Sequence, residues 1–332
     1  MRSAHLPGLG RISVGMRIYV GIDVGAVSTN LAVLGEDRGV LHTSYLRAQG
    51  DPIGSVRAIL RGAARSLGDP EVRRCGATGS GRLLAAALAG ADVVRNEITA
   101  HARAALHFFP GARTVIEIGG QDSKVILIDD GVPVDFAMNT VCAAGTGSFL
   151  DYQAARMGIT IEELARLAAA APESARVSGR CAVFAESDMI EKQQRGAARD
   201  AILKGLCEAL VRNFLSSVAK GKRLLPPVVF QGGVASNRAV VDAFERELGV
   251  KLEVPAHHNV MGAIGIALLA AGEGEVQPPT RFRGFDLPGT ALASSVFECP
   301  ECANRCDIVE IFDGADLVTR WGSRCGRWDL AE

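Results

Sequence analysis

The feature that most constrains this chain is an internal repeat of one strand–turn–strand pattern. Ile22-Asp-Val-Gly leads through a polar turn into residues 31–34, and ninety-four positions later Ile116-Glu-Ile-Gly leads through a similar turn into residues 125–128. Each copy places a carboxylate just before its turn. Apolar runs on both sides of a glycine turn are typical of a β-hairpin. Two copies of one hairpin predict two related α/β halves.

Helices and further strands are predicted around the hairpins. Apolar residues at helical spacing predict helices over residues 81–88, 96–109, 161–171, 184–194, 201–220 and 260–271. Short apolar runs predict buried strands at 227–231 and 252–254. With 48% hydrophobic residues, the 332-residue chain has ample material for a core. We therefore expect an α/β fold of two lobes, with one hairpin on each side of a ligand cleft.

Four regions are expected along the chain. Residues 1–17 are predicted to be a disordered N-terminal extension, and residues 18–271 to be the two-lobed core. The composition changes at Gly272, and residues 272–289 are rich in glycine, proline and charge, which is typical of a linker. Residues 290–332 contain half of the eight cysteines and are predicted to form a Cys-rich module.

The charge balance argues against several classes of partner. The chain has 36 Lys and Arg against 37 Asp and Glu, so bulk charge would not hold it on nucleic acid or on an anionic membrane. No apolar run approaches the roughly 20 residues of a membrane span, and we expect no signal peptide. Eight cysteines in such a chain favour metal or redox chemistry over disulfides. We expect a cytoplasmic protein that binds neither nucleic acid nor membranes.

The two hairpin turns are the candidate phosphate site. The chain contains neither a Walker A sequence nor a G-x-G-x-x-G fingerprint. Backbone N–H groups of a tight glycine turn can bind an anion, and a carboxylate before the turn can hold Mg²⁺ through water. The alternative is two ordinary hairpins of a buried sheet. The polar run Gly119-Gly-Gln-Asp favours the phosphate site, since a plain hairpin has no need of these groups.

Five motifs in a fixed order make a more specific case. They are Gly21-Ile-Asp-Val-Gly-Ala-Val-Ser-Thr-Asn, Glu117-Ile-Gly-Gly-Gln-Asp-Ser-Lys, Asn139-Thr-Val-Cys-Ala-Ala-Gly-Thr-Gly-Ser-Phe-Leu-Asp, Arg180-Cys-Ala-Val-Phe-Ala-Glu-Ser-Asp and Gly232-Gly-Val-Ala-Ser-Asn. Together they resemble the BadF/BadG/BcrA/BcrD ATPase family, the activators of 2-hydroxyacyl-CoA dehydratases. That family shares the superfold of acetate and sugar kinases, heat-shock chaperone ATPases and actin.

This resemblance implies a role for each motif in binding ATP with Mg²⁺. Asp23 and Glu117 would act on the Mg²⁺ side, and Gln121 or Asp122 would orient the attacking water. The implied phosphate-binding residues are Gly25, Ser28, Thr29, Gly119, Gly120 and Lys124. The residues expected to border the adenosine are Gly232, Gly233 and Asn237. Two positions depart from the family pattern, which commonly has Lys in place of Asn30 and Asp in place of Glu117.

Cys142 and Cys181 occupy the family's cluster positions. Each is expected to begin a helix, whose N-terminus lowers the pKa of a thiol and tunes the potential of an Fe–S cluster. A [4Fe–4S] cluster takes four ligands, so two per chain imply one cluster per homodimer. The alternative is that both are small buried apolar residues, as free cysteines often are.

The C-terminal cysteines have the spacing of a second metal site. Cys299-x2-Cys302-x3-Cys306-x18-Cys325 encloses a hairpin signal at Asp313-Gly. Such a pattern predicts a tetrathiolate Zn²⁺ site, with a second Fe–S cluster as the alternative metal. Free thiols are the less favoured interpretation, because so short a segment has little core without a metal.

The resemblance implies an oxygen-sensitive, homodimeric ATPase that activates another enzyme. It would take an electron from a ferredoxin or flavodoxin and pass it to a 2-hydroxyacyl-CoA dehydratase or a related reductase. One alternative is a sugar or amino-sugar kinase of the same superfold, which would leave Cys142 and Cys181 without a role. Another is a scaffold or sensor that binds ATP without turnover.

Overall fold

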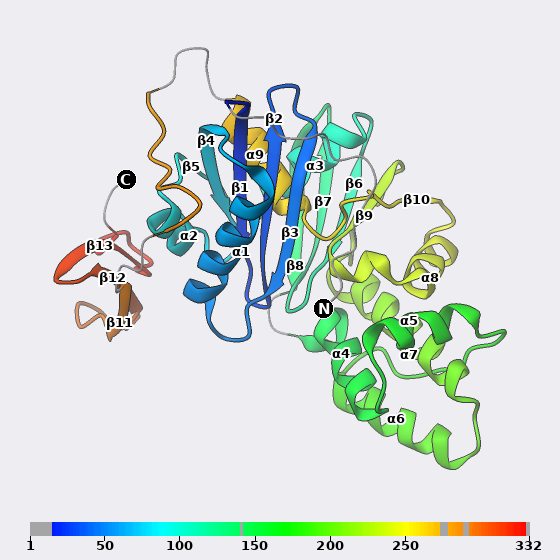
Figure 1. Cartoon of the computed structure of the whole chain (residues 1–332). Coiled ribbons are helices and arrows are strands. Elements are labelled where there is room, and N and C mark those ends of the chain that lie inside the picture. The colour runs from blue at the N-terminus through cyan, green and yellow to red at the C-terminus, as the bar shows by residue number, and fades with distance from the viewer. Residues whose placement is uncertain (1–14, 140–141, 273–277, 288–291, 330–332) are drawn as a thin grey trace. The chain divides into compact units, whose positions relative to one another are not determined.

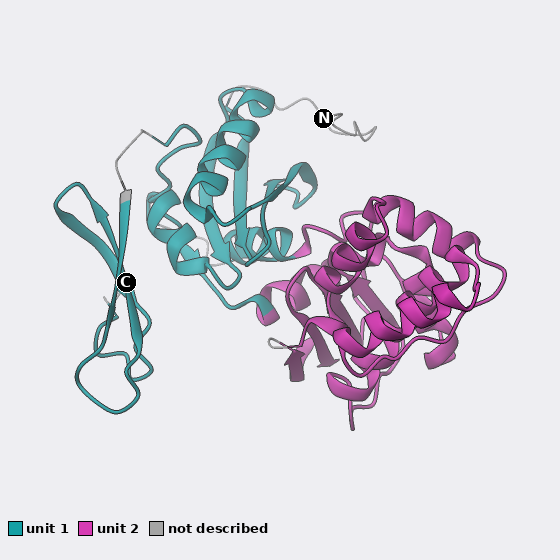
Figure 2. Ribbon diagram, turned by 90° about the horizontal axis from the view of Figure 1, so that it is seen from below, with its two compact units in different colours: residues 1–97, 262–332 teal, residues 98–261 magenta. Residues whose placement is uncertain are grey.

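The computed structural model describes residues 15–139, 142–272, 278–287 and 292–329 (Figure 1). The predicted N-terminal extension lies almost wholly outside the described residues, and so does part of the predicted linker. The chain divides into two compact units (Figure 2). Unit 1 comprises the residues up to Glu97 and those from Gly262 onward, and unit 2 is Ile98–Met261.

Each unit is built on a mixed five-stranded sheet, and the two sheets have the same order. In unit 1 the order is β3-β2-β1-β4-β5, and in unit 2 it is β8-β7-β6-β9-β10. The strands of unit 1 are β1 (Arg17–Val24), β2 (Ser28–Gly35), β3 (Val40–Arg47), β4 (Glu71–Thr78) and β5 (Val93–Val94). Those of unit 2 are β6 (Thr114–Ile118), β7 (Ser123–Asp129), β8 (Val132–Asn139), β9 (Val228–Gln231) and β10 (Leu252–Glu253). The predicted repeat and two-lobed α/β fold are confirmed.

The pairing of the strands is also repeated. In both sheets the first three strands along the chain are antiparallel neighbours, whereas β4 and β9 lie parallel to β1 and β6. The register places Asp23 opposite Asn30 in the first hairpin and Glu117 opposite Lys124 in the second. The two carboxylates predicted from the repeat thus occupy equivalent positions.

The described helices include six that lie close to where the apolar spacing predicts them. In unit 1 they are α1 (Pro52–Leu67), α2 (Arg82–Ala89) and α9 (Met261–Gly272). In unit 2 they are α3 (Glu97–Phe108), η1 (Ala143–Gly145), α4 (Gly147–Arg156), α5 (Ile161–Ala170), α6 (Ala182–Gln194), α7 (Arg199–Ser217), η2 (Gly233–Ser236) and α8 (Arg238–Leu248). None of the described helices is long and apolar enough to span a membrane.

The chain passes from one unit to the other at α3 and again at α9, and each of these helices packs on the sheet of the unit to which it belongs. α9 follows β10 but belongs to unit 1, where it lies so close to β1 that a Cβ on Gly21 would be 2.0 Å from the Ala263 carbonyl oxygen. Only glycine allows this approach. α3 follows β5 but packs on the second sheet, where Ala102 and Ala105 contact a buried cluster with Val115 and Val229.

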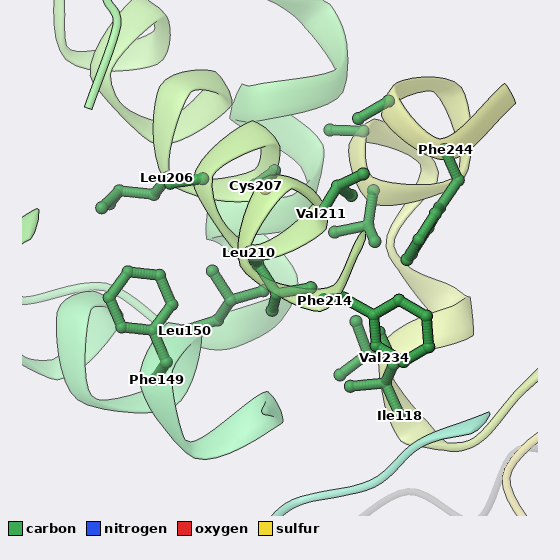
Figure 3. Packing of buried hydrophobic residues seen from close by; sticks show 14 of the residues in the cluster. Ile118, Phe149, Leu150, Leu206, Cys207, Leu210, Val211, Phe214, Val234 and Phe244 are labelled. Carbon is green, nitrogen blue, oxygen red and sulfur yellow. The ribbon is translucent and has the colours of Figure 1, made fainter. Parts of the chain in front are cut away.

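The core of unit 2 is centred on α7 (Figure 3). Leu210 and Phe214 of α7 are fully buried, and the ring of Phe214 meets that of Phe244 from α8 edge-on at 5.5 Å. Phe149 from α4 belongs to the same cluster. Cys207 is completely buried there, as expected for a core cysteine.

The C-terminal residues pack on unit 1. β11 (Leu292–Glu298), β12 (Asp307–Asp313) and β13 (Asp316–Trp321) form an antiparallel sheet, which confirms the hairpin predicted at Asp313-Gly. Ile311 is 1% exposed and belongs to the core cluster of unit 1. Within the predicted linker, Leu287 is buried in that cluster, and Thr280 Oγ1 donates to Asp92 Oδ2 at 2.6 Å. The division between core and module remains a prediction.

Candidate nucleotide site and cysteine loops

The turns of the two hairpins have the same backbone hydrogen bond. The Gly25 N–H donates to the Ser28 carbonyl at 2.9 Å, and the Gly119 N–H donates to the Asp122 carbonyl at 3.0 Å. A tight turn of this kind directs successive backbone amides toward one side, where they can bind an anion. Each unit therefore carries one candidate phosphate-binding turn.

The first turn follows a buried carboxylate. Asp23 is 8% exposed, and its Oδ2 lies 3.5 Å from the Asn30 side-chain amide on β2. Thr29 is completely buried, and its hydroxyl lies 2.7 Å from that of Ser55 in α1. The Thr29 hydroxyl thus has a partner within the core, and the expected role of Thr29 in binding phosphate stays a prediction.

The second turn is followed by a buried lysine. Lys124 Nζ lies 2.8 Å from Glu117 Oε2 and 2.9 Å from Asp122 Oδ1, and its side chain is 2% exposed. This ammonium forms ion pairs with two carboxylates, and its expected contact with a phosphate stays a prediction. Burial raises the pKa of Glu117, and Asp122 adds to the rise while Lys124 opposes it. Gln121 is exposed and Asp122 is partly exposed, as residues that orient a water must be.

A glycine pair lies beside the same carboxylate. Gly232 has φ +92°, and a Cβ there would be 2.7 Å from Glu117 Oε1. Its N–H donates to the His258 carbonyl at 2.7 Å, and His258 Nδ1 lies 3.0 Å from the Gly232 carbonyl oxygen. The sequence gives no signal for this contact, because His258 and Gly232 are 26 residues apart. Asn237 is 4% exposed and caps α8 by accepting from the Ala239 N–H, so it positions the turn from within the core.

The side chain of Asn139 forms two hydrogen bonds with the backbone of Cys142. The Cys142 N–H donates to Asn139 Oδ1 at 2.9 Å, and Asn139 Nδ2 donates to the Cys142 carbonyl at 2.6 Å. Cys142 begins the single 3₁₀ turn η1, and α4 starts only at Gly147. The expected helix start at Cys142 is thus a short turn, because the chain bends again before α4.

A second asparagine holds the other cysteine loop. Cys181 is the N-cap residue of α6, as expected, and Asn213 Nδ2 donates to the Gly179 carbonyl just before it at 2.7 Å. Asn213 Oδ1 also lies where it would be 2.7 Å from a Cβ on Gly145. Asn213 is therefore in contact with both loops. Its signal in the sequence is an amide at a position of α7 whose other buried residues are apolar or glycine.

The first cysteine loop is joined to the second phosphate turn. The Gly147 N–H donates to the Gly119 carbonyl at 2.8 Å, and the Ser148 N–H donates to the Gly120 carbonyl at 2.8 Å. A Cβ on Gly147 would lie 2.9 Å from the Gly119 carbonyl oxygen, so the close approach requires glycine. Only four residues lie between Cys142 and Gly147.

Both candidate cluster ligands are accessible to solvent. Cys142 and Cys181 are both free and half-buried. Large apolar side chains lie exposed nearby in the same elements: Val183 and Phe184 in the first turn of α6 are 68% and 64% exposed, and Tyr152 of α4 is 55% exposed. Half-exposed thiols beside exposed apolar residues suit a site completed by a second protein chain.

The tetrathiolate site expected at the C-terminal cysteines stays a prediction. Among the described residues, no three His, Cys, Asp or Glu side chains lie close enough to hold one metal ion. The buried Cys299 sulfur instead accepts a hydrogen bond from Trp328 Nε1 at 3.1 Å. The Cys299 N–H donates to the Cys306 carbonyl at 2.8 Å, while Cys302 and Cys325 are exposed. The backbone of residues 299–306 is thus closed by a hydrogen bond, but the cysteines of the predicted site differ in their exposure to solvent.

Comparison with known proteins gives consistent relatives. The model of the BadF/BadG/BcrA/BcrD ATPase family matches residues 20–270. The (R)-2-hydroxyglutaryl-CoA dehydratase activating ATPase of Acidaminococcus fermentans is 34% identical over 259 residues, which is 77% of this chain and 98% of that protein. The activator of lactoyl-CoA dehydratase of Anaerotignum propionicum is 35% identical over 253 residues, which is 76% of this chain and 96% of that protein.

A solved structure agrees with the same assignment. The activator of the 2-hydroxyisocaproyl-CoA dehydratase from Clostridium difficile, with bound ADPNP, matches with a TM-score of 0.69 and 29% sequence identity. The match covers 76% of this chain and 94% of that one. The C-terminal sheet of this chain lies beyond the residues that the family model matches.

Proposed function

The chain belongs to the BadF/BadG/BcrA/BcrD ATPase family, and from this premise we propose that it uses ATP hydrolysis to deliver an electron to a partner enzyme. The observation that carries the proposal is the hydrogen-bonded contact between the second phosphate turn and the start of α4, five residues after Cys142. It gives the nucleotide site a direct physical connection to a candidate cluster ligand.

ATP with Mg²⁺ is the proposed nucleotide. The turns at Gly25 and Gly119 hold phosphates through backbone amides, with Asp23 and Glu117 on the Mg²⁺ side. Gly232 and Gly233 border the adenosine. The bound ADPNP of the relative from Clostridium difficile supports an ATP-binding role for this fold.

The proposed hydrolysis step uses the exposed side of the second turn. Asp122 accepts a hydrogen bond from the attacking water and Gln121 orients it, so that the water lies in line with the terminal phosphate. Lys124 holds Asp122 Oδ1 at 2.9 Å and so fixes the direction in which the second carboxylate oxygen points. The turn amides stabilise the negative charge on the transferred phosphoryl group.

The proposed electron carrier is one [4Fe–4S] cluster per homodimer. Cys142 and Cys181 supply two thiolates, and a symmetric partner chain supplies the other two. When bound, the cluster stores and transfers one electron. The protein's part is to hold the two thiolates at the starts of η1 and α6.

Partners are proposed from chemistry around the second cysteine. A hollow of about 740 Å³ lies along the loop that precedes Cys181, and its charged lining residues are Arg176, Arg180, Arg212, Asp188 and Glu247. The arginines outnumber the carboxylates, which favours a partner that presents acidic groups. We propose that a dehydratase-type or reductase-type acceptor is the recipient of the electron and that a ferredoxin or flavodoxin is the donor.

The test is whether the nucleotide acts on the cluster through the turn. Anaerobic protein reconstituted with iron and sulfide is exposed to an iron chelator with ADP or with a non-hydrolysable ATP analogue. We expect the rate of iron loss to differ between the two nucleotides in the parent. Gly147→Ala, which forces the Gly119 carbonyl away, should reduce that difference while nucleotide still binds.

The matched control is Gly62→Ala in α1, where a Cβ meets no atom within 4 Å. It should behave as the parent. A parent protein that assembles no cluster would refute the electron-transfer function, and iron loss that is indifferent to nucleotide would refute the coupling.

A further inference from the structure

A small cavity beside the first turn has one wall from the C-terminal sheet. Its volume is about 260 Å³, and its lining includes Gly25 and Ala26 of the turn, Leu84 of α2 and Trp321 at the end of β13. Among the described lining residues, Trp321 alone lies outside residues 20–270, the range that the family model matches. An element outside the family core thus borders the candidate phosphate turn.

The C-terminal sheet has two different faces. Val309 is opposite Trp321 in the β12–β13 ladder, and both pack with Ile311 against the core of unit 1. The other face carries Ile308, which is fully buried and pairs with Phe297. Trp321 therefore belongs to the face that the sheet presents to unit 1.

The second tryptophan belongs to the cysteine end of the same sheet. The ring of Trp328 lies 5.1 Å from that of Phe297, its indole N–H donates to Cys299 Sγ, and Arg320 lies over its ring. The two tryptophans of the chain thus have separate surroundings, one beside the first turn and one beside the cysteines.

The segment that precedes the sheet is fastened beside the C-terminal end of α2. The Arg281 N–H donates to Asp92 Oδ1 at 2.8 Å, and the Arg283 N–H donates to the Ala89 carbonyl at 2.9 Å. Gly90 has φ +68°, and a Cβ there would be 2.0 Å from the Arg281 carbonyl oxygen. These bonds hold residues 281–283 against unit 1, so the sheet does not depend on Trp321 alone for its position.

The loop before helix α2 is hydrogen-bonded to the end of β1, next to the first phosphate turn. The Gly81 N–H, just before α2, donates to the Val24 carbonyl at 2.8 Å. Gly79 has φ +91°, and a Cβ there would lie 2.4 Å from the Val24 carbonyl oxygen and 2.5 Å from Asp23 Oδ1. A displacement of Trp321 would therefore act on the end of β1 through α2 and the loop before it.

From these contacts we propose that Trp321 is a positioning residue for the first phosphate turn, and that the C-terminal sheet thereby senses the nucleotide bound there. The proposal rests on the proposed function in one respect, namely that the turn at Gly25 holds a phosphate. It goes beyond that function by giving the sheet, which lies outside the family core, a part in nucleotide binding.

Single-tryptophan variants test the proposal in the full-length protein. In Trp328→Phe only Trp321 emits, and its fluorescence should change on titration with ADP and Mg²⁺. In Trp321→Phe only Trp328 emits, and its fluorescence should stay constant.

By calorimetry, Trp321→Ala should raise the Kd for ADP about threefold to tenfold, the range for residues that act on a site through packed neighbours. Trp328→Phe should leave that Kd unchanged.

The outcomes distinguish a failure of the proposed nucleotide binding from a failure of the positioning role of Trp321. If calorimetry detects no nucleotide binding by the parent, the proposed function itself fails. If the parent binds ADP but the emission of Trp321 is unchanged and Trp321→Ala binds as the parent does, the positioning role is overturned. Far-UV circular dichroism checks that Trp321→Ala is folded. Should it not be, the conservative Trp321→Phe and Trp328→Phe pair still decides the question by fluorescence.

Discussion

A lysine that is only 2% exposed is tolerated in this chain because two carboxylates surround it. Lys124 occupies the position opposite Glu117, and the equivalent position in the first hairpin is Asn30, opposite Asp23. The repeat therefore pairs a carboxylate with an amide in one copy and with an ammonium in the other. A buried charge without its partner is strongly destabilising, so these cross-strand pairs are sensitive to substitution.

Lys124→Met should lower the free energy of unfolding by about 3–5 kcal/mol, because it leaves Glu117 buried without its cation. Urea denaturation monitored by circular dichroism measures this. The control is Lys251→Met, whose side chain is 84% exposed and pairs with Glu245. It should cost no more than about 1 kcal/mol. Equal losses of stability in the two variants would contradict the importance of the ion pairs that Lys124 forms with Glu117 and Asp122.

Asp122→Asn should leave ATP binding largely intact and slow hydrolysis by about 10²-fold to 10⁴-fold, the scale for loss of a group that positions or deprotonates water. Phosphate release under saturating ATP measures the rate, and calorimetry measures binding. Asp129→Asn is the control, because Asp129 lies at the other end of β7 in an exposed pair with Arg113. Hydrolysis at the parent rate in Asp122→Asn would remove this residue from the mechanism.

Asn213→Ala should reduce the iron retained after anaerobic reconstitution, because it frees the backbone that precedes Cys181. The loss of a buried hydrogen bond should also cost about 1–3 kcal/mol of stability. Iron analysis and nucleotide affinity are measured on the same samples, and the affinity should be unchanged. Gln193→Ala, on the exposed side of α6, provides the comparison. Full iron retention in Asn213→Ala would show that Cys181 needs no such support.

At the scale of elements, the hairpins and most helices follow from the sequence. The repeat predicts β1–β2 and β6–β7 because the apolar–glycine–apolar pattern is local. Helix α1 was not predicted, although Asp51-Pro52 is a helix-start signal and Val56, Ile59 and Leu60 have helical spacing. The signal was therefore present in the sequence.

The contacts that shape the candidate site could not be predicted in the same way. Lys124 is identified as a buried counterion only by the cross-strand register, and Asn213 reaches loops more than thirty residues away in the chain. The 3₁₀ turn after Cys142 depends on the bond from Gly147 to Gly119. Such pairings are long-range, and a single sequence does not state which distant residues meet.

The C-terminal sheet makes an element-scale prediction. Ile311→Ala should destabilise the docking of the sheet by about 2–5 kcal/mol, the usual cost of a large-to-small change in a core. Hydrogen exchange should then quicken in α2, against which β13 packs. Val296→Ala on β11, 62% exposed, is the control. Unchanged exchange in α2 would mean that the sheet is independent of unit 1.

For the whole molecule, the cysteine arithmetic predicts assembly. Anaerobic protein should carry about two irons per chain, from one four-iron cluster shared by two chains. Cys142→Ala or Cys181→Ala should abolish the cluster and weaken the dimer, because a shared ligand stabilises the state that binds it. Iron analysis and sedimentation measure both effects, while ATP should still bind.

The control for these variants is Cys207→Ala. Burial raises the pKa of the Cys207 thiol to about 12, which leaves it protonated and unsuited to bind iron. That variant should keep its iron. A cluster retained by monomeric protein, or four irons per monomer, would contradict the shared site.

The two sheets have the same strand order, yet the connection from the third to the fourth strand differs greatly between them. In the first half a single helix, α1, joins β3 to β4, whereas in the second half η1 and α4–α7 join β8 to β9, and this connection carries Cys142 and Cys181. If the two halves descend from one duplicated ancestor, the hairpins are the structure that both halves inherited. The longer connection is then an insertion that the second half acquired. Natural selection can then alter the task that the ATPase drives by remodelling one crossover, while both hairpins keep their sequence.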